Sequence, residues 1–195
     1  DYLHDNDNFG LDIRISDESG KLLETGGGIR KALPLFERDQ PILIHNVDIL
    51  SNVNLQALYD RPCQQHADAA LLVSQRKTKR YLLFDQSDCL VGWTNIETHE
   101  VKSPYPEFGY SQMLAFSGIH VIMPELCSLM HTWPERFPII DFYLHHCSET
   151  DIRCVVKEDL QLLDVGKVDT LEAAETFISQ QLVNSSTHQL VNSST

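Results

Sequence analysis

The chain has 195 residues, of which 42% are hydrophobic, as expected for a globular α/β protein with one hydrophobic core. Its 28 acidic residues outnumber 15 lysines and arginines, and the formal net charge of −13 disfavours non-specific binding to nucleic acids and anionic membranes. No apolar run reaches the roughly 18 residues of a membrane span, and residues 1–10 lack the features of a signal peptide, so we expect a cytoplasmic protein.

The five cysteines are odd in number and form no C-x-x-C motif, a pattern typical of reduced thiols rather than of a disulfide framework. A zinc site is an alternative, because His145, His146 and Cys147 are adjacent and Cys63 lies close to His66. Neighbouring residues on a helix point in different directions, and no second ligand pair occurs at a suitable spacing, so the sequence disfavours zinc.

The N-terminal part of the chain alternates between predicted strands and helices. Residues 11–16 alternate apolar and polar side chains, which predicts a half-buried strand. The glycines at 26–28 indicate a loop that leads into a helix over 29–36, where apolar residues recur at helical spacing. Residues 41–46 form an almost uninterrupted apolar run, which is typical of a central strand covered on both faces.

A helix over 52–66, capped by Asn52 or Asn54, and a strand over 67–75 come next. Strands and helices that alternate in this way predict an α/β fold with a mainly parallel, Rossmann-like sheet and helices on both faces. Ligands of such sheets bind outside the carboxyl ends of the strands. We therefore expect a binding site at that edge.

The middle of the chain departs from this alternation. Residues 80–95 read as two short strands joined by a polar turn, which predicts a small antiparallel excursion from the sheet. The strand predicted over 113–122 is interrupted by Ser117 and Gly118, where we expect a bulge or the close approach of a ligand. His45 and His120 lie in strand-like segments and are expected to be hydrogen-bonded structural histidines, although His45 could also contact a substrate.

The C-terminal part contains five further predicted elements, which are helices over 124–130, 137–147 and 168–182 and strands over 152–159 and 160–166. The last residues repeat the sequence QLVNSST and have no core-forming pattern. We therefore expect one α/β domain over 1–182, followed by a flexible or artefactual tail over 183–195.

Two aspartates, Asp48 and Asp164, each follow an apolar strand, although they are far apart in the sequence. Paired carboxylates at the rim of a sheet form a natural Mg²⁺ site, because this cation prefers hard oxygen ligands and bridges to phosphates. The alternative is that Asp48 caps a helix and Asp164 shapes a turn. Similarly, the glycines at 26–28 could allow backbone amides to approach an anion, or could form a tight turn with no ligand.

The chain resembles the sugar-1-phosphate nucleotidyltransferases, most closely the branch with N-acetylmuramate-1-phosphate uridylyltransferase and mannose-1-phosphate guanylyltransferase. The resemblance lies in blocks that follow in the family's order, which are FGLDIRIS, LLETGGGIRKALPLF, PILIHNVDIL, FSGIHVIMPEL, FPIIDFYL and LLDVGKVDTLEAAE. These blocks cover nearly the whole chain from Phe9 to Glu175. Their combination is much more specific than any one of them.

The resemblance implies a role for particular residues. Asp48 and Asp164 would be the catalytic residues and the ligands of a Mg²⁺ cofactor. The E-T-G-G block would place three nucleotide-binding residues, namely Glu24, Thr25 and Gly26, against the nucleoside. Asn46 and Gly118 would contact the sugar substrate.

The implied reaction is the transfer of a nucleoside monophosphate from a nucleoside triphosphate to a sugar-1-phosphate, giving a nucleotide sugar and pyrophosphate. Its partners would be these two substrates, with no nucleic acid and no membrane, and the oligomeric state stays open. Members of the family have a glycine-rich phosphate-binding loop upstream of the first matching block, and no such loop occurs in residues 1–195. The domain is therefore expected to be incomplete at its N-terminus, and a catalytically inactive domain that binds a nucleotide or a partner is the alternative.

Overall fold

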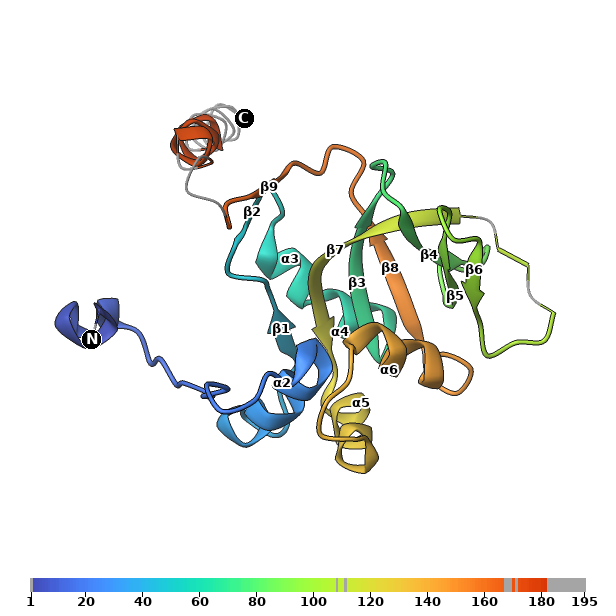
Figure 1. The fold of residues 1–195 in the computed structure, drawn as a ribbon, viewed down its shortest axis with the longest axis horizontal. Coiled ribbons are helices and arrows are strands. Elements are labelled where there is room, and N and C mark those ends of the chain that lie inside the picture. The colour runs from blue at the N-terminus through green and yellow to red at the C-terminus, as the bar shows by residue number, and fades with distance from the viewer. Residues whose placement is uncertain (1, 108, 111, 167–169, 171, 182–195) are drawn as a thin grey trace.

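A central β-sheet is the main feature of the computed structural model, which describes residues 2–107, 109–110, 112–166, 170 and 172–181. The strands of this sheet lie in the order β6-β5-β4-β7-β3-β8, with β1 paired beside β7 (Figure 1). Their bounds are β1 Ile42–Ile44, β3 Ala69–Ser74, β4 Arg80–Phe84, β5 Leu90–Asn95, β6 Glu100–Lys102, β7 Gln112–Ile122 and β8 Ile152–Val156.

The described helices are short. They are α1 Tyr2–Asp5, α2 Glu24–Ala32, α3 Leu55–Tyr59, α4 Arg61–Gln65, α5 Pro124–Leu129 and α6 Ile139–His146, with 3-10 turns at Asp7–Gly10, Leu33–Leu35 and Met130–Thr132. The predicted cap of α3 is Asn54, whose side-chain oxygen accepts the backbone N–H of Ala57 at 2.9 Å. The single helix predicted over 52–66 is divided at Asp60, which ends α3 and precedes α4, where Pro62 occupies the first turn.

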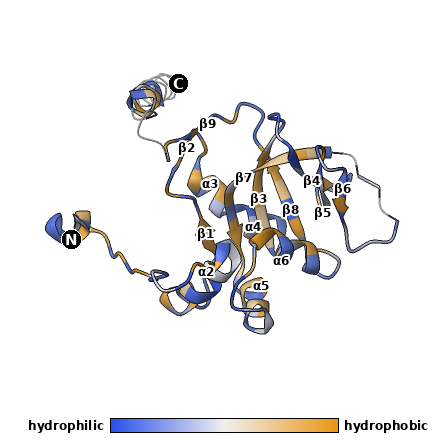
Figure 2. Cartoon of the chain, viewed as in Figure 1, coloured by the Kyte–Doolittle hydropathy of each residue, from blue (hydrophilic) through white to orange (hydrophobic). Residues whose placement is uncertain are grey.

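The core extends over both faces of β3, which is fully buried. Ala69, Leu71 and Val73 face a cluster that includes side chains of α2, α5 and α6, whereas Ala70 and Leu72 face a second cluster with Leu58 of α3. Successive residues of a strand point to opposite faces, so helices cover the sheet on both sides. Figure 2 shows the hydrophobic residues concentrated in these central strands.

The predicted α/β class, the helices on both faces and the antiparallel excursion are confirmed. The direction of the strands differs from the expectation of a mainly parallel sheet. Among the described strands only β3 and β8 pair in parallel, because β7 runs antiparallel to its neighbours β1, β3 and β4. Apolar runs identify buried strands but do not reveal which neighbour each strand chooses.

The strand predicted over 11–16 is not formed. These residues are extended but pair with no strand in the described part of the chain, and Leu11 and Ile15 are 66% and 67% exposed. A strand needs a partner for its backbone hydrogen bonds, so alternation alone does not create one. Figure 1 shows this segment leading away from the sheet toward the N-terminus.

A separate two-stranded antiparallel sheet is formed by β2 (Ile49–Ser51) and β9 (Leu162–Asp164). It lies beyond β1 and is followed by a helix over 172–181 (Figure 1). The predicted final helix is thus formed where it is described, and the predicted tail over 183–195 lies outside the described residues. Among the described helices, none combines the length and apolar character that crossing a lipid bilayer requires.

Candidate functional site

The small sheet brings the two predicted aspartates together. Asp48 immediately precedes β2, Asp164 is the last residue of β9, and Ile49 lies opposite Asp164 in the antiparallel register. The backbone N–H of Val165 donates a 2.8 Å hydrogen bond to the carbonyl oxygen of Asp48. The β2–β9 pairing therefore fixes the backbones of both aspartates as neighbours.

The two carboxylates converge on Gly166. A methyl group at the Cβ position of Gly166 would lie 3.2 Å from Oδ1 of Asp164 and 3.4 Å from Oδ2 of Asp48. The backbone N–H of Gly166 also donates to Oδ1 of Asp164 at 3.0 Å. Because Gly166 has no side chain, both carboxylate oxygens lie around one small space at the surface.

This pair of carboxylates fits a magnesium ion in its chemistry. Both are hard oxygen ligands, and both residues are exposed, which leaves room for the waters and phosphate oxygens that Mg²⁺ normally retains. Neither forms an ion pair with a described residue, since the ion pairs found there involve other acids. Within the same residues, no group of three or more His, Cys, Asp or Glu side chains is placed to bind a metal.

Asn46 and Gly118 also lie together. In the pairing of β1 with β7, Ile44 lies opposite His120, and continuing this register by two residues brings Asn46 to Gly118. A Cβ atom on Gly118 would lie 3.1 Å from Nδ2 of Asn46. The side chain of Asn46 therefore covers the backbone of β7 next to Asp48.

Gly118 is required by the backbone of β7. Its φ of +81° is in the left-handed region, where a side chain is strained. The pairing of β7 with β3 shifts register between Leu71 and Val73, and the hydroxyl of Ser117 donates to the carbonyl of Leu72 at 2.8 Å. The bulge that we predicted from the Ser-Gly interruption is thus present.

The glycines of the E-T-G-G-G block lie inside a helix and not in the predicted loop. The N–H groups of Gly26 and Gly27 both donate to the carbonyl of Phe137, at 3.0 and 3.2 Å. A Cβ atom on Gly26 would lie 2.3 Å from the ring of Phe137, and one on Gly27 would lie 2.4 Å from the carbonyl of Glu135. The glycines allow α2 to pack against the segment that leads into α6, which is a structural reason for this motif.

Glu24 and Thr25 support the same contact. The carboxylate of Glu24, which has a left-handed φ of 62°, forms a 2.8 Å ion pair with Arg136. The hydroxyl of Thr25 accepts the backbone N–H of Ile139 at 3.1 Å, at the first residue of α6. Figure 1 shows α2 and the β2–β9 pair at opposite ends of β1, so the residues predicted to bind nucleotide are grouped apart from the two aspartates.

His120 differs from the hydrogen-bonded histidine that we predicted. It is 2% exposed, and neither ring nitrogen has a hydrogen-bond partner among the described residues. It packs against the rings of Phe116 and Tyr143, with centroids at 5.4 and 5.7 Å. Burial lowers the pKa of His120 to about 3, so the imidazole is neutral at physiological pH.

Two of the five residues considered for zinc, His146 and Cys147, have other contacts in the structure. Nε2 of His146 accepts the indole N–H of Trp133 at 3.0 Å, and the pKa of His146 is lowered by burial and by the neighbouring His145. Cys147 is buried, and burial raises the pKa of its thiol to about 11. The thiol of Cys147 donates to the carbonyl of Leu144 at 3.4 Å.

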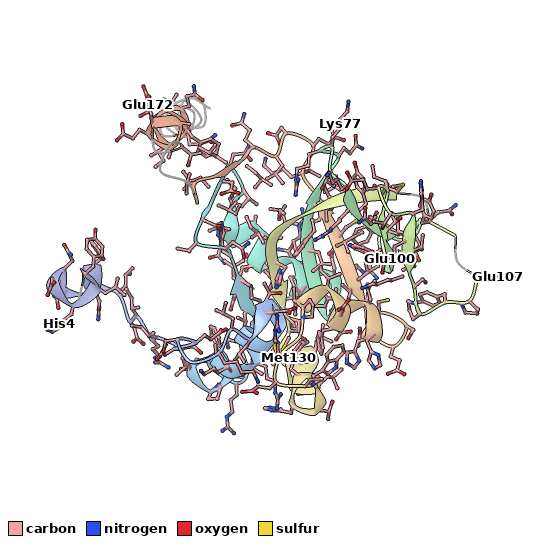
Figure 3. The ribbon with its side chains drawn as sticks, in the orientation of Figure 1. His4, Lys77, Glu100, Glu107, Met130 and Glu172 are labelled. Carbon is pink, nitrogen blue, oxygen red and sulfur yellow. The ribbon has the colours of Figure 1, made fainter. Side chains whose placement is uncertain are left out.

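A groove that we did not predict from the sequence lies between the antiparallel excursion and α6. It has a volume of about 570 Å³, and its lining includes the cationic residues Arg76, Arg80 and Lys102 and the aromatic residues Tyr81, Trp93 and Phe116. In Figure 3, Lys77 and Glu100 mark the loop after β3 and the strand β6 that border this region. The run RKTKR in an acidic chain is the sequence signal that could have indicated it.

Among curated proteins, the chain is similar to N-acetylmuramate alpha-1-phosphate uridylyltransferase of Neisseria meningitidis serogroup B. The two are 29% identical over 128 residues, which cover 65% of this chain and 50% of that protein. The chain thus spans about half the length of this curated relative. No protein-family model matches the chain.

Several solved structures share the fold at low sequence identity. HddC from Yersinia pseudotuberculosis has a TM-score of 0.59 at 14% identity, over 91% of this chain and 74% of that chain. A putative glucose-1-phosphate thymidylyltransferase from Bacillus anthracis has a TM-score of 0.62 at 12% identity, over 90% and 69%. The inositol-1-phosphate CTP transferase from T. maritima has a TM-score of 0.53 at 13% identity, over 77% and 60%.

These neighbours agree with the family resemblance that was inferred from the motifs. The sequence match is to a uridylyltransferase that acts on a sugar phosphate, and the structural matches show the fold. The chain is thus similar to the sugar-1-phosphate nucleotidyltransferases in sequence and has their Rossmann-like α/β fold, as the resemblance predicted.

Proposed function

We propose that this chain is part of a sugar-1-phosphate nucleotidyltransferase, which transfers a nucleoside monophosphate from a nucleoside triphosphate to a sugar-1-phosphate. The observation that carries the proposal is the convergence of Asp48 and Asp164 at one edge of a nucleotidyltransferase fold. The pairing of β2 with β9 brings the two residues together, and both carboxylates are exposed and form no ion pair with a described residue. A shared divalent cation would offset the repulsion between these two like charges.

In the proposed reaction, a phosphate oxygen of the sugar-1-phosphate attacks the α-phosphorus of the nucleoside triphosphate. The new P–O bond forms as the bond from the α-phosphorus to the bridging oxygen breaks, and pyrophosphate leaves with the electron pair. The attacking phosphate is already an anion, so no general base has to remove a proton. Positioning and charge neutralisation then provide the catalysis.

Each candidate site residue would have its own role in this reaction. Asp48 and Asp164 would hold Mg²⁺, which would neutralise charge on the phosphates and align them. The amide of Asn46 would donate to or accept from hydroxyl groups of the sugar, and Gly118 would leave room for this amide against the backbone of β7, at the border of the sugar site. The resemblance assigns the nucleoside contacts to Glu24, Thr25 and Gly26, whose polar groups in this structure bind the segment that leads into α6.

The test is a screen for pyrophosphate release by the full-length protein, with four nucleoside triphosphates crossed against several sugar-1-phosphates in the presence of Mg²⁺. We expect release with one sugar and one or two bases, and none when either substrate is omitted. A folded protein that releases no pyrophosphate with any pair would overturn the proposal. The screen would also identify the base and the sugar.

A catalytically inactive domain that binds a nucleotide or a partner is the second candidate. The packing of Gly26 and Gly27 against Glu135 and Phe137 favours it, because this contact explains the E-T-G-G-G block without any chemistry. Under this alternative, calorimetry would detect nucleoside triphosphate binding that is unchanged in Asp48→Asn, and the screen would detect no pyrophosphate.

A further inference from the structure

We propose that the groove between β4, β5 and α6 binds an anionic substituent, a carboxylate or a second phosphate, on the acceptor sugar. The proposal rests on the proposed function, since it defines which class of sugar-1-phosphate the protein takes. It assigns specificity to Arg76 and Arg80, which are not among the residues that the family resemblance implicates. The charge of the groove, its aromatic lining and its position relative to Gly118 support this assignment.

The two arginines carry positive charge that no described carboxylate neutralises. The ion pairs found in the described part of the chain include neither Arg76 nor Arg80. By contrast, Nζ of Lys102 lies 3.3 Å from Asp141 and 3.9 Å from Glu100, so the two acids of the groove are close to the lysine. In a chain with a net charge of −13, two unpaired arginines in one groove favour an anionic ligand.

Arg76 is held in place for this role. One guanidinium nitrogen, Nη2, donates to the carbonyl of Phe116 at 2.9 Å, which ties the loop after β3 to β7. The same loop is fixed by the hydroxyl of Tyr81, which accepts the N–H of Thr78 at 3.0 Å. A guanidinium fixed through one nitrogen keeps other N–H donors for the paired hydrogen bonds that carboxylates and phosphates accept.

The aromatic residues of the groove suit a sugar ring. Tyr81, Trp93 and Phe116 are partly buried, and each leaves part of its surface open to the groove. Nζ of Lys102 lies 5.2 Å from the centroid of the Trp93 ring, which holds this indole in place by a cation–π contact. Binding sites commonly combine apolar and aromatic walls with a few placed polar groups, as this groove does.

Strand β7 connects the groove to the proposed acceptor site, because it carries both Phe116 and Gly118. Phe116 precedes Gly118 by two residues, a distance of about 7 Å along a strand. Phe116 also contacts the ring of His120, so Phe116 lies on the face of β7 that carries this buried residue. With its phosphate at Asp48 and its ring against the amide of Asn46, an acceptor sugar would extend its far substituents toward Phe116 and Arg76.

The test is direct binding to the full-length protein without nucleotide, measured by calorimetry with three probes. These are glucose 1-phosphate, glucuronic acid 1-phosphate and glucose 1,6-bisphosphate. We expect at least one of the two probes that carry a second anionic group to bind about 10-fold or more tightly than glucose 1-phosphate, as expected for a charge-assisted hydrogen bond. Comparing glucuronic acid 1-phosphate with glucose 1,6-bisphosphate shows whether the groove prefers a carboxylate or a phosphate.

Arg76→Gln and Arg80→Gln should each reduce this preference several-fold, and the double variant should abolish it. Arg61→Gln is the matched control, because Arg61 is an exposed arginine at the start of α4, outside the groove lining. Circular dichroism checks that each variant is folded. A variant that did not fold would be replaced by Arg76→Lys and Arg80→Lys, which keep the charge but lose the paired donors and should reduce the preference in part.

Three results would overturn the proposal. One is equal affinity for all three probes, and another is binding of none of them. The third is a loss of affinity for all three to the same extent in the arginine variants, which would mean that the arginines hold the 1-phosphate. Pyrophosphate release that persists with a neutral sugar would leave the proposed function intact. The nucleotidyltransferase activity and the anion-binding role of the groove can therefore be refuted independently.

Discussion

Asp48 and Asp164 lie side by side because the N–H of Val165 binds the carbonyl of Asp48 and both carboxylates converge on Gly166. This arrangement depends on the small β2–β9 sheet and not on the large central sheet. The candidate metal site is therefore formed by the antiparallel pairing of two short strands that are far apart in the sequence. Its geometry can be tested separately from its chemistry.

Asp48→Asn and Asp164→Asn should each reduce pyrophosphate release by about 100-fold or more, because an amide keeps the shape but removes the negative charge that would attract Mg²⁺. The unfolding midpoint should be unchanged, since both carboxylates are exposed and form no ion pair with a described residue. Asp159→Asn is the matched control, because its carboxylate is also exposed and binds Lys157. Unchanged rates in both test variants would refute the assignment.

Gly166→Ala should raise the Mg²⁺ concentration needed for half-maximal activity by about 10-fold, as expected when a residue that supports metal ligands is altered. The added methyl group would lie 3.2 Å from Asp164 Oδ1, which would have to shift, and it would fill the space next to Asp48 Oδ2 at a van der Waals distance of 3.4 Å. A magnesium titration of activity measures this effect. The control is Gly109→Ala, where no heavy atom lies within 4 Å of the added group, and an equal shift in both variants would contradict the prediction.

Gly26→Ala should destabilise the protein by about 1–3 kcal/mol, the usual cost of overpacking a core. Helix propensity alone would favour alanine, but the new Cβ would lie 2.3 Å from the ring of Phe137 and 2.9 Å from its carbonyl oxygen. Urea unfolding measures the free energy, with Gly20→Ala as the control, because nothing lies within 4 Å of that position. An equal or greater stability of Gly26→Ala would show that the glycine has no packing role.

Local sequence signals predicted the elements that local physics determines. The apolar run around Ile42, the Asn54 cap and the Ser117–Gly118 interruption all correspond to observed structure. The prediction of a strand over 11–16 was wrong, because this segment has no strand partner among the described residues. The helical state of Gly26 depends on its contact with Phe137, which is far away in the sequence, and glycine alone does not indicate such a contact.

In the candidate site, too, some features could be predicted from the local sequence and others are created only by the fold. A carboxylate after an apolar strand is visible in the sequence, so Asp48 and Asp164 could be identified before their convergence was known. The groove could not, because its residues come from the loop after β3, from four strands and from α6, and only the fold assembles them. The charged run that contains Arg76 and Arg80 is a local signal, but it does not reveal which side chains face a common space.

The stability of the protein should depend on His120 below neutral pH. Burial lowers the pKa of His120 to about 3 in the folded protein, whereas an unfolded histidine has a pKa of about 6.5. Between these values the unfolded state binds one more proton than the folded state, so the free energy of unfolding falls as the pH falls. The slope from this residue alone should approach about 1.4 kcal/mol per pH unit in the middle of that window.

Urea unfolding of the wild-type protein and His120→Leu from pH 7.5 to pH 4 measures this dependence. Leucine cannot take up a proton, so the variant should lose the histidine contribution and become progressively more stable than the wild type as the pH is lowered. The neighbours Phe116 and Tyr143 add no charge, since the first is apolar and burial raises the pKa of Tyr143. His4→Gln, at an exposed position, should follow the wild-type curve, and parallel curves for all three proteins would show that His120 is accessible to protons in the folded state.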